Sequence, residues 1–151
     1  MFQQNILATA TSIHVRVAVS KGDPIDQAQW RHTALWFSFG DQSPPVVIHA
    51  VGSPHAFTLE VLQHYFPDTS GNIAGEVEVG HLRRPMTKAY LVFFVSQTPI
   101  DNLDREFNCQ VWVERALARL KAANLLTEEQ YERGVDGMTT VLMEATDEGM
   151  G

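Results

Sequence analysis

The chain has 151 residues, of which 44% are hydrophobic and 19% charged, a composition that suits one globular domain with a single core. Its formal net charge of -7 argues against nucleic acid as a partner, because phosphate binding requires a clustered basic face. No apolar run is long enough for a membrane span and no basic flank precedes a long apolar block, so we expect neither a span nor a signal peptide.

Alternating and β-branched sequence predicts strands over the first two-thirds of the chain. In the strand at 31–40, Thr33 and Leu35 lie on one face, while His32 and Trp36 lie on the other. The turn formers that follow join this strand to the next, so the two should form a hairpin. The predicted strands are 12–20, 31–40, 46–52, 56–65, 76–82 and 88–97.

Two helices are predicted in the last third of the chain. The first runs from about residue 107 to 123, and the second starts after a capping box made by Thr127 and Gln130 and ends near Ala145. The tail at 146–151 should fray. Strands followed by helices predict an α+β fold, with the two C-terminal helices packed on one face of an antiparallel sheet and residues 1–151 forming a single domain.

Cys109 is the only cysteine, and it opens the first predicted helix. A helix N-terminus favours thiolate over thiol, so this position suits a nucleophile. The helical period also places Cys109 on the core-facing stripe with Val113 and Leu120, and a small buried packing residue would occupy the same place. One cysteine excludes an internal disulfide and fits a reducing compartment, so we expect a cytoplasmic protein.

Among six histidines, His32 and His49 stand out because they lie on the two arms of the predicted hairpin within apolar sequence. Whichever residues form the turn, both imidazoles should be able to approach a helix packed on their face of the sheet. A thiol needs one imidazole as base and a second polar group to orient it. The same three residues could instead bind a metal, but no fourth ligand is evident, so we expect neither a metal nor a cofactor.

The order of three segments resembles the circularly permuted papain-like (NlpC-type) superfamily, which includes lecithin:retinol acyltransferase-like proteins and PPPDE-type thiol peptidases. "RHTALWFSFG" is similar to the histidine strand, "VVIHAVG" to the strand with the third residue, and "NCQVWVERAL" to the cysteine helix. The last segment also resembles an "NCQ-x-WV" helix of small fungal proteins. The resemblance implies a permuted papain-like domain with Cys109 as nucleophile, His32 as base and His49 as the orienting residue.

That resemblance implies a cysteine-dependent acyl-transfer enzyme: a hydrolase, acyltransferase or cyclase acting on an ester, thioester or amide through a thioacyl intermediate. Asn108 or Gln110 would assist the oxyanion, and Trp36 and Trp112 are candidates for either substrate wall or core. The substrate would be a small-molecule, acyl-carrier or peptide acyl group. Two alternatives stay open: a PPPDE-type peptidase or isopeptidase, and a non-catalytic binding domain of the same fold. The oligomeric state is not indicated.

Overall fold

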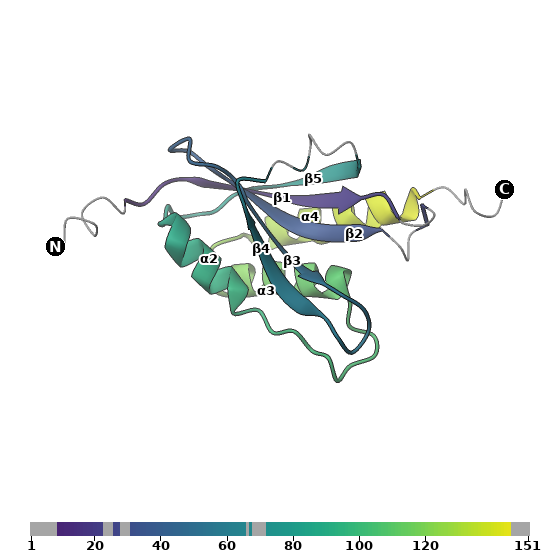
Figure 1. Cartoon of the computed structure of the whole chain (residues 1–151). Helices are drawn as coiled ribbons and strands as arrows, with labels where there is room; N and C mark the ends of the chain where they lie inside the picture. The colour runs from purple at the N-terminus through teal and green to yellow at the C-terminus, as the bar shows by residue number, and fades with distance from the viewer. Residues whose placement is uncertain (1–8, 23–25, 28–30, 66, 68–71, 146–151) are drawn as a thin grey trace.

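The computed structural model describes residues 9–22, 26–27, 31–65, 67 and 72–145, which form an α+β fold (Figure 1). One sheet has the strand order β4-β3-β2-β1-β5, and every neighbouring pair is antiparallel. The predicted fold class, an antiparallel sheet with two C-terminal helices, is confirmed. The strands are β1 (Ile13–Ser20), β2 (His32–Phe39), β3 (Val46–Val51), β4 (Thr58–Gln63) and β5 (Ile73–His81). The helices are α2 (Lys88–Ser96), α3 (Cys109–Ala122) and α4 (Glu128–Met143).

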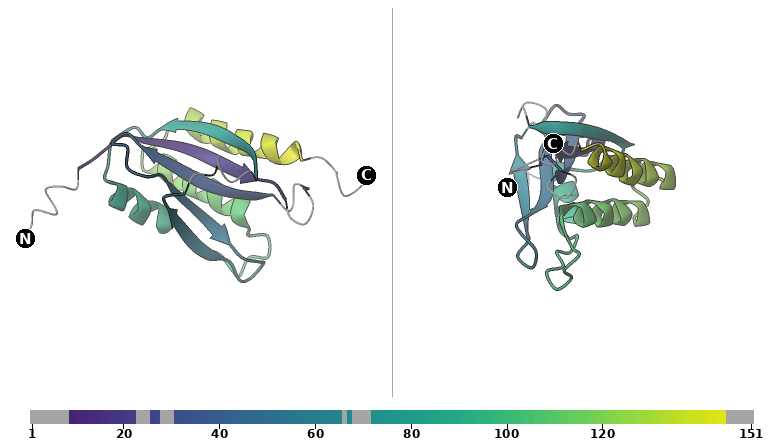
Figure 2. Two further views of the ribbon diagram at one scale, coloured as in Figure 1. Left: turned by 45° about the horizontal axis from the view of Figure 1, so that its top comes forward. Right: turned by 90° about the vertical axis from the view of Figure 1, so that its right-hand side faces the viewer.

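The two faces of the sheet have different surroundings. Helices α3 and α4 lie on one side of it (Figure 2), and that side holds the main core. Leu35 and Phe37 of β2 belong to this core together with Trp112 of α3. Because side chains alternate along a strand, Ala34 and Trp36 point to the opposite face, where they form a smaller separate cluster. We call this second side the outer face.

Helix α3 forms where the apolar period predicts it. Asn108 is its N-cap, and the Asn108 Oδ1 accepts a hydrogen bond from Val111 N at 2.9 Å. The buried side of α3 carries Trp112 and Leu120, and each is fully buried. Because this side packs on β2 and β3, the predicted placement of the cysteine helix across the histidine strands is confirmed.

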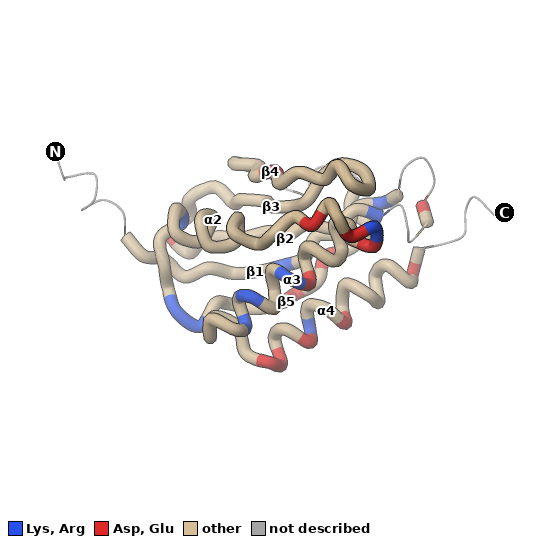
Figure 3. The backbone as a smooth tube through the Cα atoms, turned by 90° about the horizontal axis from the view of Figure 1, so that it is seen from below, with Lys and Arg blue, Asp and Glu red and all other residues tan. Residues whose placement is uncertain are grey.

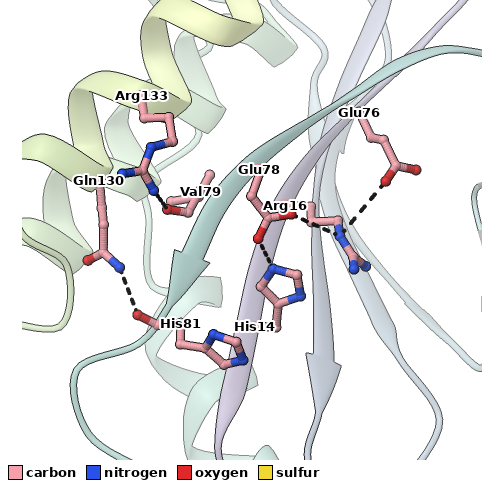
Figure 4. A network of polar contacts seen from close by, with 8 residues as sticks. All are labelled: His14, Arg16, Glu76, Glu78, Val79, His81, Gln130 and Arg133. Atoms are coloured by element: carbon pink, nitrogen blue, oxygen red, sulfur yellow. Dashed lines mark hydrogen bonds and ion pairs between the residues drawn. The ribbon is translucent and has the colours of Figure 1, made fainter.

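Helix α4 begins with the predicted capping box, in which Thr127 and Gln130 satisfy each other's backbone N–H groups. It is also held to β5 by side chains that donate to strand carbonyls (Figure 4): Gln130 Nε2 to His81 O, and Arg133 to Val79 O, both at 2.9 Å. Acidic residues lie along the side of α4 that faces away from the sheet (Figure 3), so the helix is amphipathic.

The prediction of a strand at 88–97 is wrong, because this segment forms helix α2. Its N-cap Thr87 accepts from Tyr90 N at 3.1 Å, and its buried residues Leu91 and Val95 are one helical turn apart. Phe93 is 62% exposed, so the apolar run does not mean that both faces are buried. The sequence predicts a strand here because the exposed side of the helix is also aromatic, so apolar residues do not recur with the helical period.

Several predicted connections fall outside the described residues. These are most of the turn at 21–30, most of the segment 66–72 and the tail at 146–151. Within the described ranges, no helix combines the length and the apolar character needed to cross a membrane.

Candidate functional site

A pocket of about 490 Å³ lies where the start of α3 meets the ends of two strands. Three separate segments build it: the start of β2, the end of β3 with its following loop, and the loop that leads into α3. Its described lining residues are Arg31, His32, Ala50, Gly52, Ser53, Pro54, Phe57, Arg105, Glu106, Phe107, Asn108, Cys109 and Gln110. Cys109 and His32, predicted from sequence as nucleophile and base, thus share one pocket.

Cys109 is the first residue of α3 and is 9% exposed. The N-terminus of a helix carries partial positive charge, which favours a negatively charged group placed there. The side-chain oxygen of Asn108 is occupied as the N-cap, so this residue anchors the turn that carries the thiol. Gln110 lines the same pocket one residue beyond the sulfur.

His32 and His49 form a hydrogen-bonded pair, with His32 Nε2 and His49 Nδ1 2.6 Å apart. The other nitrogen of His49, Nε2, lies 2.7 Å from Glu60 Oε1. His49 and Glu60 are direct cross-strand partners on β3 and β4, which explains their contact. The three side chains therefore make one chain of polar contacts across β2, β3 and β4.

The expectation that both histidines approach the helix layer is not met. The strand alternation that directs Leu35 toward α3 places His32 and His49 on the outer face, where they line a small pocket of about 60 Å³ with Tyr65. His32 reaches Cys109's pocket as well because it is the first residue of β2, at the end of the sheet. His49 lies behind His32 and is not among the described lining residues of that pocket.

Burial, together with the neighbouring His49, lowers the pKa of His32 to about 4, and the charge of Glu60 opposes this shift. His32 is therefore an uncharged imidazole at neutral pH, able to accept a proton. Within the described part of the chain, no hydrogen bond joins the Cys109 sulfur to His32. Such contacts are often long in a free enzyme and tighten when substrate binds.

The two tryptophans named as candidate substrate wall lie elsewhere. Trp112 is fully buried in the core and its Nε1 donates to Thr98 O at 3.2 Å. Trp36 lies on the outer face under the guanidinium of Arg16, 4.9 Å from the ring centroid. Neither is among the described residues that line the Cys109 pocket.

Sequence reasoning missed two polar residues of the site. Arg31 lines the pocket and is 8% exposed; two of its nitrogens contact the Asp26 carboxylate at 2.7 Å, and a third donates to Val141 O. Glu60 could have been found, because the alternation of β4 together with a hairpin register places it beside His49. The contact of Arg31 with Val141 O joins segments 110 residues apart, so no local pattern shows it.

A second polar cluster lies on β1 and β5 (Figure 4). His14 contacts the carboxylate of Glu78, Arg16 lies 3.5 Å from Glu78 and 3.9 Å from Glu76, and the rings of His14 and His81 stack with centroids 4.8 Å apart. The acidic and basic side chains of this cluster pair with one another, and Cys109 is not among them. We therefore interpret the cluster as cross-strand pairs that stabilise the sheet.

The sequence profile of a family of unknown function, DUF6540, matches residues 23–127, well over half of the chain. The chain belongs to this family. The matched region contains Cys109, His32, His49 and Glu60, so the whole candidate site lies within the part that defines the family, while α4 follows it. No curated protein and no solved structure was found to match the chain.

Proposed function

We propose that this protein is a cysteine-dependent acyl-transfer enzyme in which Cys109 is the nucleophile and His32 the base. The observation that carries the proposal is that a thiol at a helix N-terminus and one member of a hydrogen-bonded histidine pair line the same pocket. A base within reach of a nucleophile, itself held by a further polar group, is the arrangement that thiol catalysis needs.

In the first step His32 takes the proton from the Cys109 thiol as sulfur attacks the carbonyl carbon of an ester, thioester or amide. The contact with His49 uses His32 Nε2, so Nδ1 is the ring nitrogen left to accept that proton. The developing oxyanion is held by the backbone N–H of Cys109 with help from Gln110.

In the second step the imidazolium of His32 returns its proton to the leaving group, and the acyl group remains on sulfur as a thioester. Water or a second nucleophile then attacks this thioester, with His32 again accepting a proton, and Cys109 is regenerated. His49 keeps the His32 ring oriented through both steps.

The fold proposed for this chemistry is the circularly permuted papain-like one. Two observations support it: the histidine strands precede the cysteine helix in the chain, and that helix packs across those strands. The pocket volume of about 490 Å³ is of the size that holds small ligands, which favours a small acyl group over an extended peptide.

The test is acylation of the protein by p-nitrophenyl acetate near pH 7.5, followed by nitrophenolate release and by intact mass. We expect Cys109 of the wild type to gain one acetyl group faster than free cysteine does, and Cys109→Ala to gain none. His32→Ala should slow acylation by about 100-fold or more, as loss of a general base does. Like Cys109→Ala, the double variant should gain no acetyl group.

Equal reactivity of the wild type and free cysteine, or a thiol that no reagent reaches, would contradict the enzyme function and favour a binding domain with a buried Cys109. Cleavage of peptide bonds without any ester or thioester turnover would favour a PPPDE-type peptidase. Circular dichroism of each variant shows whether the fold has been kept.

A further inference from the structure

We infer that Glu60 is a positioning residue of this site: through His49 it sets which nitrogen of His32 carries the proton, and it compensates the charge that forms on His32 during acyl transfer. The inference rests on the proposed function and extends the site by one residue. It is carried by a continuous chain of contacts, 2.7 Å from Glu60 to His49 and 2.6 Å from His49 to His32.

The direction of these hydrogen bonds follows from the chemistry of the Glu60 carboxylate. A carboxylate only accepts, so His49 Nε2 must be the nitrogen that carries hydrogen and donates to Glu60. In an uncharged His49 ring Nδ1 then has the lone pair, and it accepts from His32 Nε2–H. His32 is left with its lone pair on Nδ1, the form required of a base for Cys109.

The charge of Glu60 matters at the moment of proton transfer. When His32 takes the thiol proton it becomes an imidazolium that is largely buried and lies beside a second imidazole. A nearby carboxylate lowers the cost of that charge, and burial strengthens its effect. Glu60 is 48% exposed, so water screens part of the effect, and we expect a smaller contribution than that of His32 itself.

A purely structural role for the Glu60 side chain explains less. β4 is an edge strand, and its backbone pairing with β3 runs from Val46–Gln63 to Val51–Thr58 without help from this side chain. The described titratable and charged groups around the Glu60–His49–His32 contacts are His32 and His49 themselves, Tyr65 on the outer-face pocket, and Arg31, Arg105, Glu106 and Cys109 on the Cys109 pocket. The Arg31 charge is taken up by Asp26, which leaves Glu60 as the carboxylate in contact with the histidine pair.

The first experiment reads the tautomers directly, by long-range ¹H–¹⁵N NMR of the histidine rings in the full chain. In the wild type we expect both His32 and His49 to carry hydrogen on Nε2. Glu60→Ala should convert His49 to a mixture of tautomers, and His32 with it. Unchanged tautomers in Glu60→Ala would overturn the inference while leaving the acyl-transfer function intact.

The second experiment follows acetylation of Cys109 by p-nitrophenyl acetate, read by intact mass, from pH 3 to 9, a range that includes the His32 pKa of about 4. The proteins compared are the wild type, Glu60→Gln, Glu60→Ala and the control Thr58→Ala on the same face of β4. Glu60→Gln keeps an acceptor oxygen but removes the charge, so the acid limb of the profile should move to lower pH while the plateau falls about 10-fold. Glu60→Ala should lose about 10- to 100-fold, because the orientation is lost as well. Thr58→Ala should match the wild type.

A wild-type profile for both Glu60 variants would overturn the inference. A Thr58→Ala profile that shifts as Glu60→Gln does would also overturn it, since the effect would then come from disturbing the edge strand. A wild type that is itself no more reactive than free cysteine would overturn the acyl-transfer function, and the tautomer measurement would still decide the positioning role.

Discussion

At the scale of single residues, the site depends on how the surroundings of Cys109 and His32 affect the charge that each side chain can carry. Cys109 sits where a helix N-terminus favours negative charge, whereas burial and His49 disfavour positive charge on His32. The resting pair is therefore expected to hold an uncharged imidazole, with the proton moving as the sulfur attacks.

The lowered pKa of His32 predicts a stability change with pH. The folded protein protonates His32 near pH 4, whereas the unfolded chain does so near the ordinary value of 6.5. Between these values the unfolded state binds the extra proton, so the unfolding free energy should decrease as the pH falls from 6.5 toward 4. The loss attributable to His32 is on the order of 3 kcal/mol.

Urea unfolding of the wild type and of His32→Gln at pH 7, 6, 5 and 4.5 measures this loss. The variant lacks the titrating ring, so its unfolding free energy should fall less over that range. The hydrogen bond from Arg31 lowers the pKa of Asp26 to about 2, so protonation of Asp26 affects stability only at lower pH. Parallel pH dependence in the two proteins would show that His32 titrates normally in the folded state.

At the scale of elements, the close packing of α4 on β5 depends on glycines. A Cβ added at Gly137 would lie 2.4 Å from Val77 Cγ1, and one added at Gly134 would lie 3.1 Å from Val79 Cγ2. Small residues on this side of the helix let its backbone approach the strand, and the hydrogen bonds from Gln130 and Arg133 are made at that short separation.

Gly137→Ala is therefore expected to destabilise the protein, although alanine is the better helix former by about 1 kcal/mol. Relieving the contact with Val77 requires a shift of helix or strand, and overpacking of this kind costs about 1–3 kcal/mol. Thermal unfolding compares it with Thr139→Ala, an exposed position on α4 where alanine should be neutral or slightly stabilising. A rise in melting temperature for Gly137→Ala would mean that the interface yields easily.

At the scale of the whole molecule, the pocket exists because loops far apart in the sequence are fixed against each other. Asn102, between α2 and α3, pairs with the backbone of Phe57 as a strand would: its Oδ1 accepts from Phe57 N at 2.8 Å and its Nδ2 donates to Phe57 O at 3.0 Å. His55 adds a contact to Asn102 O at 2.9 Å. These bonds hold one wall of the pocket against the loop that carries Cys109.

Asn102→Ala should leave both backbone groups of Phe57 without their partner and lower the unfolding free energy by about 1–3 kcal/mol. Hydrogen exchange at the Phe57 amide should accelerate, and acylation of Cys109 should slow because the pocket wall is loosened. Asn102→Asp is the comparison variant: it keeps the acceptor for Phe57 N, but it replaces the donor with a charged oxygen that faces Phe57 O. Unchanged exchange at Phe57 in Asn102→Ala would show that other contacts hold this wall.

Much of the scaffold follows from local sequence. Period-two alternation indicates β1, and apolar runs rich in β-branched or aromatic residues and bounded by turn formers indicate β2 and β3. The apolar stripe with Asn108 as cap indicates α3. The Thr127–Gln130 capping box marks the start of α4. These features depend on neighbours within one or two turns, so the sequence by itself determined them, and it also singled out Cys109, His32 and His49.

Other features were decided only by the tertiary structure. Whether residues 88–96 are helix or strand depends on which side finds a partner, since Phe93 stays exposed while Leu91 is buried. Alternation separates the two faces of β2 but does not say which face the helices cover; the packing of α3 on the side of Leu35 placed His49 on the outer face. The register of the β3–β4 hairpin brings Glu60 to His49, and the alignment of β2 beside β3 brings His32 to His49. The complete chain of contacts therefore forms only once three strands align.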